Sequence, residues 1–363
     1  MKDSKNGFGK ILEISSYPPP RSGWAVRVEL VKKHLARAGH DCVVINIGPS
    51  RAIPSTEYET VRDARDFVTK VWRYCREGYV VHAHANGDAV KGLVLALIAE
   101  FLNLLAGKRC VLTFHAGAIQ RYFPQKQNLW LAPLYWLLFV IPRRIICNSE
   151  AVKRCIAGYG ISSAKIVAIP AFSQQYLESD AGPLPSELDA FLRRFPTIVF
   201  TYLCMRPLFF PLTLVDGMAS VMARRPDVGL VICGMAGHAD DGVRPAFEAA
   251  IARHGIRDRM CILDDLDHDA FLTVLQRSAL YLRTPITDGV ASSVLEALAL
   301  RVPVVACENG TRPAGVITYP PTDAHRLAAA VEHVIDHRAA VVSSIPRLEL
   351  RDTVADEVTV LTA

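Results

Sequence analysis

Two carboxylates and several small residues lie together in one short stretch of the chain, residues 287–297. Asp288 precedes a segment whose apolar residues have helical spacing, and Glu296 lies within the first two turns of that segment. The free N–H groups and positive dipole end of a helix N-terminus favour an anion such as a diphosphate. Carboxylates accept hydrogen bonds from sugar hydroxyls. These residue types at this spacing predict a nucleotide-sugar site.

A purely structural interpretation competes with this one. Ser293 and Glu296 have the spacing of a capping box, in which the glutamate only satisfies a backbone N–H group at the start of the helix. Taken alone, the stretch favours the capping box, because short motifs often match by chance. The surrounding sequence therefore has to decide between the two.

Strands and helices alternate around this stretch. Apolar runs at 278–282 and 302–306 flank it and predict two buried strands. Further strands are predicted at residues 10–16, 42–47, 79–84, 166–170, 197–202, 229–233 and 260–263, with helical segments between them. Such alternation is typical of parallel sheets covered by helices, and it predicts an α/β protein with two such domains.

Composition narrows the class of protein. The 363 residues suffice for two domains, and the 51% hydrophobic and 21% charged content is that of a folded chain. The 41 basic and 36 acidic residues give a net charge of +5, but the basic residues are dispersed, so we expect no nucleic-acid partner. The nine cysteines form no Cys-x-x-Cys pair and indicate reduced core residues. Without an apolar leader or a membrane-spanning run, we expect a cytoplasmic protein.

Residues 288–306 resemble the Glu-x7-Glu signature of the retaining glycosyltransferases of the GT-B fold, family 4 type. The usual order is an acid, a glycine, a short loop, Glu-Ala and a Pro-Val-Val-Ala strand, and here Asp288 replaces the first glutamate. The resemblance covers about residues 10–340 and implies two Rossmann-like parallel-sheet domains facing a cleft. It implies that Glu296 binds the donor ribose and that Asp288 holds the sugar and phosphates. Backbone N–H groups would assist Asp288, from Gly289, Val290, Ala291 and Ser292.

The resemblance also implies a reaction. A hexosyl group would pass from a nucleoside-diphosphate sugar to an acceptor with retention at the anomeric carbon. The leaving phosphate would deprotonate the acceptor, so neither a metal nor a cofactor is expected. The expected acceptor is a glycan, a lipid-linked molecule or a small molecule, in bacterial polysaccharide or glycoconjugate synthesis.

Two positions in the first half also resemble the family. Gly23, in the turn after the first strand, corresponds to a glycine that lies against the donor phosphate. His115, at a strand end, corresponds to a histidine that contacts the sugar and stabilises developing positive charge. His82 and His84 share one face of a strand, and with no third metal ligand evident we interpret them as histidines satisfied by hydrogen bonds.

One segment departs from the family. An Arg and a Lys-Gly pair usually clamp the donor diphosphate after the first strand of the second domain, and here Cys204 and Phe209 occupy the positions of these cations. Arg206 is our first candidate to replace them, and Arg312 is the second. Because neutralising a diphosphate is a large electrostatic effect, the alternative function is a catalytically degenerate GT-B homologue acting as a binding or scaffold subunit.

The predicted domains follow from these elements. We expect an N-terminal acceptor-side domain at residues 1–172 and a linker at 173–194. A C-terminal nucleotide-sugar-binding domain follows at 195–340, and the segment 341–363 returns to the first domain, as the resemblance implies.

The most apolar stretch, residues 129–141, is too short to span a bilayer and is interrupted by Pro133. It suits a buried helix, and its Trp and Tyr residues with flanking cations also suit an interfacial segment. Arg27, Lys33 and Arg37 add positive charge to the predicted first helix. We therefore predict peripheral contact with the inner face of the cell membrane.

Overall fold

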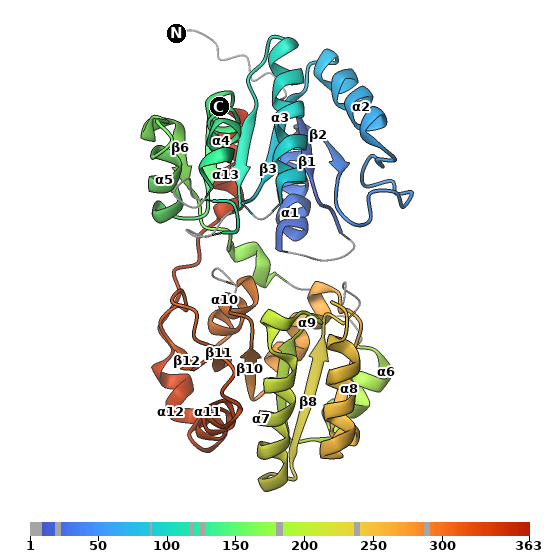
Figure 1. The fold of residues 1–363 in the computed structure, drawn as a ribbon, viewed down its shortest axis with the longest axis vertical. Coiled ribbons are helices and arrows are strands. Elements are labelled where there is room, and N and C mark those ends of the chain that lie inside the picture. Colours follow the sequence, from blue (N-terminus) through green and yellow to red (C-terminus); the bar gives the residue numbers. More distant parts are fainter. Residues whose placement is uncertain are drawn as a thin grey trace. The chain divides into compact units, whose positions relative to one another are not determined.

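The computed structural model describes residues 9–18, 23–87, 89–115, 120–123, 128–178, 184–235, 240–286 and 291–363. The chain divides into two compact units, which are described separately below. Unit 1 comprises Met1–Gln175 with Arg351–Ala363, and unit 2 comprises Tyr176–Leu350. Each unit contains a six-stranded parallel sheet covered by helices on both faces (Figure 1). The predicted α/β class with two Rossmann-like parallel sheets is confirmed.

Unit 1 has the strand order β2-β1-β3-β4-β5-β6. Its strands are β1 (Lys10–Ser15), β2 (Asp41–Asn46), β3 (Val80–Ala85), β4 (Val111–Phe114), β5 (Arg144–Cys147) and β6 (Ile166–Ala168). One sheet face packs against α1 (Gly23–Arg37) and α13 (Thr353–Thr362). The other packs against α2 (Ala64–Arg76), α3 (Val90–Leu105), α4 (Ala132–Val140) and α5 (Glu150–Ala157). The strand order reverses between β1 and β3, and ligands of open α/β sheets bind beyond the strand ends at such a point.

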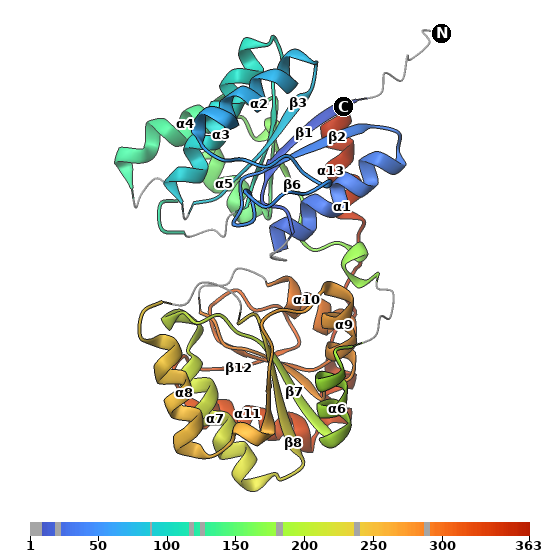
Figure 2. The same ribbon diagram turned by 90° about the vertical axis from the view of Figure 1, so that its right-hand side faces the viewer.

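The C-terminal helix α13 packs against α1, although more than 300 residues separate them in the sequence (Figure 2). Asp352 caps α13 by accepting a hydrogen bond from the backbone N–H of Ala355, which fixes the start of the helix. Val354, Val358 and Leu361 recur at helical spacing and are buried with Val31 of α1. The final segment therefore belongs to the core of unit 1.

Unit 2 has the strand order β12-β11-β10-β7-β8-β9, with its reversal between β7 and β10. Its strands are β7 (Thr197–Tyr202), β8 (Val228–Cys233), β9 (Met260–Ile262), β10 (Leu280–Arg283), β11 (Val304–Cys307) and β12 (Val316–Tyr319). One face packs against α7 (Pro211–Arg224), α8 (Val243–His254) and α11 (Ala324–Asp336). The other packs against α6 (Ser186–Arg194), α9 (His268–Gln276) and α10 (Ser292–Ala299). A short helix, α12 (Arg338–Ser344), follows α11.

Two features of unit 2 differ from the sequence analysis. The range 173–194 was interpreted as a linker, but helix α6 forms within it and buries Leu188 and Leu192 in the core. Its apolar face is only one narrow stripe in a polar segment, so composition alone concealed it. Strand β12 was not predicted, because it is a four-residue strand at the sheet edge in which only Tyr319 is buried.

Two expectations about the whole chain can be compared with the structure. All nine cysteines are free thiols, and six of them are buried as predicted, whereas Cys42, Cys155 and Cys204 are only partly buried. Within the described ranges, no helix is both long enough and apolar enough to cross a lipid bilayer.

Candidate functional site

Glu296 lies in α10, the helix that follows β10 at the carboxyl edge of the unit 2 sheet. Its side chain is buried, at 4% exposure, and burial raises the pKa of its carboxyl to about 8. No described residue forms a hydrogen bond or an ion pair with this carboxyl. The fold therefore buries an acid at the strand edge without supplying it a partner from the described residues.

The capping-box interpretation does not describe this helix. The N-cap residue is Ala291, which makes no side-chain cap, and Ser293 lies inside the helix. The hydroxyl of Ser293 is instead 2.9 Å from that of Tyr281 on β10. Glu296 therefore does not close a capping box with Ser293.

The remaining predicted residues of this stretch are only partly described. Ala291 and Ser292 form the N-terminus of α10, whose first backbone N–H groups lack partners within the helix. Asp288, Gly289 and Val290 lie outside the described residues. The roles predicted for all five stay predictions.

Arg206 and Arg312 differ in the freedom of their side chains. Arg206 is exposed in the segment after β7, and no described residue binds its guanidinium. Arg312 follows β11 and is partly buried, and its guanidinium donates to the backbone carbonyls of Cys307 (2.9 Å) and Pro285 (2.6 Å). Arg312 thus joins two loops at the strand edge, whereas Arg206 is available to bind an anion.

Arg283 is a third cation at this edge, and the sequence analysis missed it. It ends β10, is 7% exposed, and donates to the carbonyl of Tyr202 on β7 at 3.1 Å. Its guanidinium also lies 5.6 Å from the ring centroids of Tyr202 and Phe209. A charged residue at the end of an apolar strand was the available signal. Arg283 therefore brings positive charge to the segment after β7, which contains Phe209.

The histidines of unit 1 are part of a buried polar cluster. Glu13 on β1 lies between two histidines of β3, with one carboxylate oxygen 2.8 Å from Nδ1 of His82 and the other 2.8 Å from Nε2 of His84. Nε2 of His82 is 2.7 Å from the hydroxyl of Thr113 on β4. These side chains face α1 and α13, because alternate residues of a strand point to the same face. The interpretation of His82 and His84 as hydrogen-bonded histidines agrees with this geometry.

The sequence analysis found no third side chain able to ligate a metal beside His82 and His84, and Glu13 is such a side chain. Among the described residues, Glu13, His82 and His84 form the one set of His, Cys, Asp and Glu side chains placed closely enough to hold a metal ion. All three are buried, and their mutual hydrogen bonds already account for the arrangement. Glu13 is 69 residues from His82 in sequence, so only the pairing of β1 with β3 reveals the contact.

His115 immediately follows β4 and adjoins this cluster. Its Nε2 is 2.8 Å from Nδ1 of His84, and it is 6% exposed. The indole of Trp24, in the first turn of α1, stacks on its ring at 4.4 Å between centroids. Gly23, the other predicted residue of unit 1, is the first residue of α1. The structure thus places His115 and the start of α1 at the carboxyl edge of the same sheet.

Arg27 was expected to lie on an exposed basic face of the first helix, and this expectation is wrong. Its side chain is 4% exposed and forms a 2.6 Å ion pair with Glu357 of α13. It also donates to the side chain and the carbonyl of Thr353, at 2.7 and 2.6 Å. Arg27 faces inward because it joins α1 to α13.

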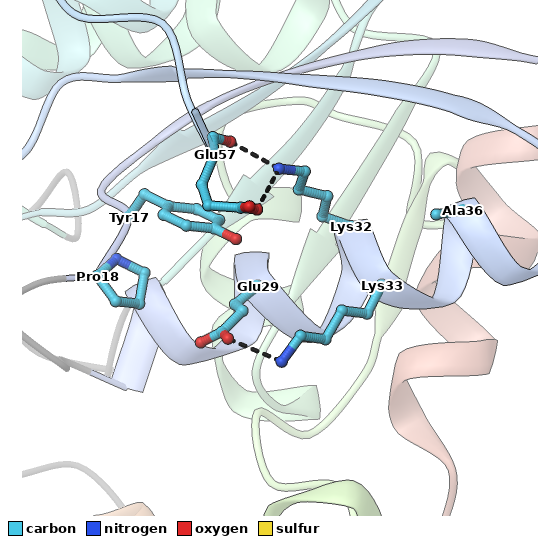
Figure 3. A pocket seen from close by; sticks show the side chains of 7 residues that line it. All are labelled: Tyr17, Pro18, Glu29, Lys32, Lys33, Ala36 and Glu57. Atoms are coloured by element: carbon cyan, nitrogen blue, oxygen red, sulfur yellow. Dashed lines mark hydrogen bonds and ion pairs between the residues drawn. The ribbon is translucent and has the colours of Figure 1, made fainter. Parts of the chain in front are cut away.

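A pocket opens on unit 1 beside α1 (Figure 3). Its lysines are paired, Lys32 with Glu57 at 2.9 Å and Lys33 with Glu29 at 2.8 Å. It is lined by these four residues with Tyr17, Pro18 and Ala36. The pocket includes none of the predicted site residues, and its charges balance.

Comparison with known proteins agrees with the fold. Residues 21–172 match the model of Glycosyltransferase Family 4, and residues 211–342 match that of Glycosyl transferases group 1. No curated protein sequence matches the chain. The two family models together cover most of both units.

Solved structures share the fold at low sequence identity. Anabaena Alr3699/HepE in complex with UDP-glucose is 17% identical with a TM-score of 0.70, and 97% of each chain is covered. S. aureus MnaA with UDP is 19% identical with a TM-score of 0.66, covering 96% of this chain and 94% of that one. Sucrose-phosphate synthase from Thermosynechococcus elongatus is 15% identical with a TM-score of 0.64, covering 97% and 95%. Given the family matches in both units and this shared architecture, the chain belongs to the GT-B glycosyltransferases of the family 4 type.

Proposed function

We propose that this glycosyltransferase transfers a hexosyl group from a nucleoside-diphosphate sugar to a glycan, lipid-linked or small-molecule acceptor. The transfer retains the anomeric configuration and requires no metal, with the leaving phosphate accepting the proton of the acceptor. The UDP-glucose bound to Anabaena Alr3699/HepE supports a donor of this class. A role in bacterial polysaccharide or glycoconjugate synthesis belongs to the same proposal.

Glu296 is the observation that carries the donor assignment. A buried polar group without a partner costs about 1–3 kcal/mol, which hydrogen bonds from a bound ligand can recover. A ribose offers two adjacent hydroxyl donors, which match the two oxygens of a carboxylate. The buried carboxyl of Glu296, without a partner among the described residues, is therefore suited to bind the ribose of the donor.

The test is a calorimetric titration with uridine, UDP and the corresponding adenosine and guanosine compounds. Glu296→Gln should weaken the nucleoside and the diphosphate alike, because the ribose is common to both. Losing a charged hydrogen bond costs about 1.5–3 kcal/mol, or roughly tenfold to over a hundredfold in affinity. Glu248→Gln, an exposed glutamate of α8, is the matched control and should leave affinity unchanged. A lower melting temperature with unchanged affinity would instead make Glu296 structural.

The retaining, metal-independent reaction has its own measurements. The anomeric configuration of the first-formed product, read by proton NMR, should match that of the donor. Turnover should also survive a chelator. By the resemblance, Asp288 acts on the sugar as its charge changes, so Asp288→Asn should lower turnover more than nucleotide affinity.

The alternative function is a catalytically degenerate GT-B homologue that serves as a binding or scaffold subunit. The observation in its favour is that Cys204 and Phe209 occupy the positions of the family cations. Failure of every nucleoside diphosphate to bind the unmodified protein would favour this alternative.

Peripheral membrane contact is part of the proposal and rests on one surface of unit 1, here called the apolar surface. It consists of exposed side chains on α3, on the short helix η2 (Leu129–Leu131) and on α4. Helix α4 packs against both α3 and η2. They are Val94, Phe101, Leu104, Leu105, Leu129, Trp130, Trp136 and Leu137. Tyr135, Leu138 and Phe139 of α4 point the other way into the core. The stretch 129–141 thus supplies both a buried face and an exposed apolar one.

Charge near the apolar surface suits an anionic lipid. Lys91, Val94, Phe101 and Leu105 follow one another along α3 at helical spacing. The sole acid of α3, Glu100, is buried, and Arg109 is exposed near the carboxyl end of α4, where it donates to the carbonyl of Ile141. Exposed apolar area bordered by cations is the pattern of an interfacial helix. We propose that this surface rests on the inner leaflet.

A further inference from the structure

The buried cluster of unit 1 is a continuous chain of hydrogen-bonding groups that ends at His115. Glu13 contacts His84 at 2.8 Å, and His84 contacts His115 at 2.8 Å. Glu13 is fully buried, and His84 and His115 are 4% and 6% exposed. His84 uses opposite ring nitrogens for Glu13 and His115, so the proton positions along this series of hydrogen bonds depend on one another.

The direction of each hydrogen bond follows from the carboxylate. An ionised Glu13 can only accept, so Nδ1 of His82 and Nε2 of His84 must both donate to it. A neutral His84 then has a bare Nδ1, which must accept from Nε2–H of His115. A neutral His115 with its proton on Nε2 has a bare Nδ1. No described residue forms a hydrogen bond with that nitrogen.

We propose that Glu13 and His84 are positioning residues that hold His115 in its Nε2–H tautomer, so that its Nδ1 accepts a hydrogen bond from a substrate hydroxyl. This inference rests on the proposed function for the identity of the substrate, a donor sugar. Trp24 adds to the arrangement by stacking on the His115 ring and fixing its plane. The role differs from electrostatic stabilisation, since a neutral acceptor selects a hydroxyl that donates.

The pKa shifts of the cluster agree with these proton positions. Burial opposes the charge of Glu13, but the charge of His82 and hydrogen bonds from both histidines outweigh it and lower the pKa of Glu13 to about 2. Burial lowers the pKa of His84, and it lowers the pKa of His115 well below the usual range, with repulsion from neighbouring cations acting in the same direction. Both imidazoles are therefore neutral near pH 7.

Lowering the pH should reverse the direction of the hydrogen bond between His84 and His115. The charged groups that surround it are Glu13 and His82 on the sheet, Arg27 from α1 and Glu357 from α13. Glu13 already accepts from both histidines of β3, and Glu357 is paired with Arg27. The bare Nδ1 of His115 can take up an added proton while the Nε2 proton passes to Nδ1 of His84. His115 then donates through Nδ1 and no longer accepts.

The experiment is ¹⁵N NMR of the full chain labelled at histidine, because protonated and bare ring nitrogens resonate far apart. His115 is assigned from the signals lost in His115→Gln. We expect the wild-type protein at pH 7.5 to show a protonated Nε2 and a bare Nδ1 at His115. A protonated Nδ1 in the wild-type protein would overturn the proposal. The measurement needs no substrate, and the one variant it requires is a folded His115→Gln for the assignment.

Two variants test whether Glu13 sets the tautomer of His115. Glu13→Gln replaces an acceptor with an amide that can donate to Nε2 of His84, so it should transfer the His115 proton to Nδ1. Asp216→Asn is the control, since it alters an exposed carboxylate 2.8 Å from the surface His254. An unchanged His115 tautomer in folded Glu13→Gln, or the same change in Asp216→Asn, would contradict the assignment of Glu13.

Kinetics separates this inference from the proposed function. Glu13→Gln should raise the KM of the donor sugar about tenfold while the affinity for the nucleoside diphosphate stays unchanged, because the diphosphate lacks the hydroxyl. If the wild-type tautomer is as stated but His115→Ala leaves KM and kcat unchanged, the substrate contact is refuted. Absence of any transferase activity, with nucleotide still bound, would refute the proposed function and leave the NMR result standing.

Discussion

At the scale of single residues, the proposed role of Glu296 predicts that its protonation couples nucleotide binding to pH. Its pKa is about 8 in the folded chain, compared with an ordinary value of 4.5. Accepting two ribose hydroxyls favours the ionised form, because a protonated carboxyl must use one oxygen as a donor. We expect nucleoside affinity to rise as the pH increases from 6 to about 8, with uptake of the ligand releasing protons. Titrations in buffers of different ionisation enthalpy measure this release, and Glu296→Gln should abolish it.

The raised pKa of Glu296 also makes the stability of the folded chain depend on pH. Between pH 4.5 and about 8 the folded chain keeps the Glu296 proton while the unfolded chain loses it. Stability contributed by this group is therefore greatest below pH 4.5 and falls as the pH rises through that window. Urea denaturation should show Glu296→Gln gaining stability over the wild-type protein as the pH rises from 5 to 8. A difference that is independent of pH would contradict the assigned burial of the acid.

Three arginines that follow or end strands of the unit 2 sheet, Arg206, Arg283 and Arg312, give another residue-scale prediction. Arg206 has no partner among the described residues, whereas the guanidinium groups of Arg312 and Arg283 donate to backbone carbonyls. Removing the charge partner of a bound diphosphate costs about 2–5 kcal/mol. Arg206→Ala should weaken UDP affinity by well over tenfold and leave uridine little affected. Arg312→Ala should mainly lower the melting temperature, since it joins two loops.

If Arg206→Ala leaves UDP affinity unchanged, Arg283 is the next residue to test. Arg283→Met keeps its packing against Tyr202 and Phe209 but removes the charge. A selective loss of UDP affinity in this variant would assign the missing positive charge to β10. Equal losses for uridine and UDP would mean that the arginine is structural.

Sequence reasoning could propose residues within one motif, but it could not see contacts made by the fold. Glu296 and His115 were proposed because each lies in a short segment that resembles the family, and their roles stay predictions. Glu13 and Arg283 were missed because their partners lie on neighbouring strands far away in sequence. Arg27 was misjudged for the same reason, since its carboxylate partner is 330 residues away. Periodicity locates a face of a helix, but it does not show which element covers that face.

At the scale of elements, strands were easier to predict than short helices. Continuous apolar runs marked the strands at the centre of both sheets, as the register of β7 with β8 and β10 illustrates. The helix α6 and the edge strand β12 bury few side chains each, so their patterns are weak. The segments after β7 and β10 are held together by hydrogen bonds such as that from Thr284 to the carbonyl of Phe209, which no local pattern predicts.

The pairing of α1 with α13 gives an element-scale prediction. Arg27 and Glu357 form a buried ion pair, and removing one partner of such a pair costs about 3–5 kcal/mol, because the other charge is left uncompensated. Arg27→Met should therefore destabilise the chain by that amount in urea denaturation. Lys33→Met is the matched control on the same helix, since its pair with Glu29 is exposed and worth about 0.3–0.5 kcal/mol. Equal losses in both variants would show that the buried pair is not important for stability.

At the scale of the whole molecule, the chain crosses between its two units twice. Unit 1 takes its first 175 residues from the N-terminus and its last helix from the C-terminus. Domain limits read from composition alone were therefore only approximate, as the position of α6 shows. The alternation of strands and helices was sufficient for the fold class, because parallel sheets require helical crossovers.

The last prediction concerns the apolar surface of unit 1. The protein should cosediment with vesicles that contain anionic lipid and should bind neutral vesicles less, since each well-placed cation contributes about 1 kcal/mol. Raising the salt should weaken the electrostatic part, whereas the exposed rings of Trp130 and Trp136 supply an apolar part that salt does not screen. Burying one large apolar side chain is worth about 1.5–3 kcal/mol, so Trp130→Ser should reduce vesicle affinity roughly tenfold or more. Leu212→Ser, an exposed apolar residue of unit 2, is the control and should bind as the wild-type protein does. If the unmodified chain stays in the supernatant at low salt, the apolar surface does not bind lipid, and the stretch 129–141 serves the core alone.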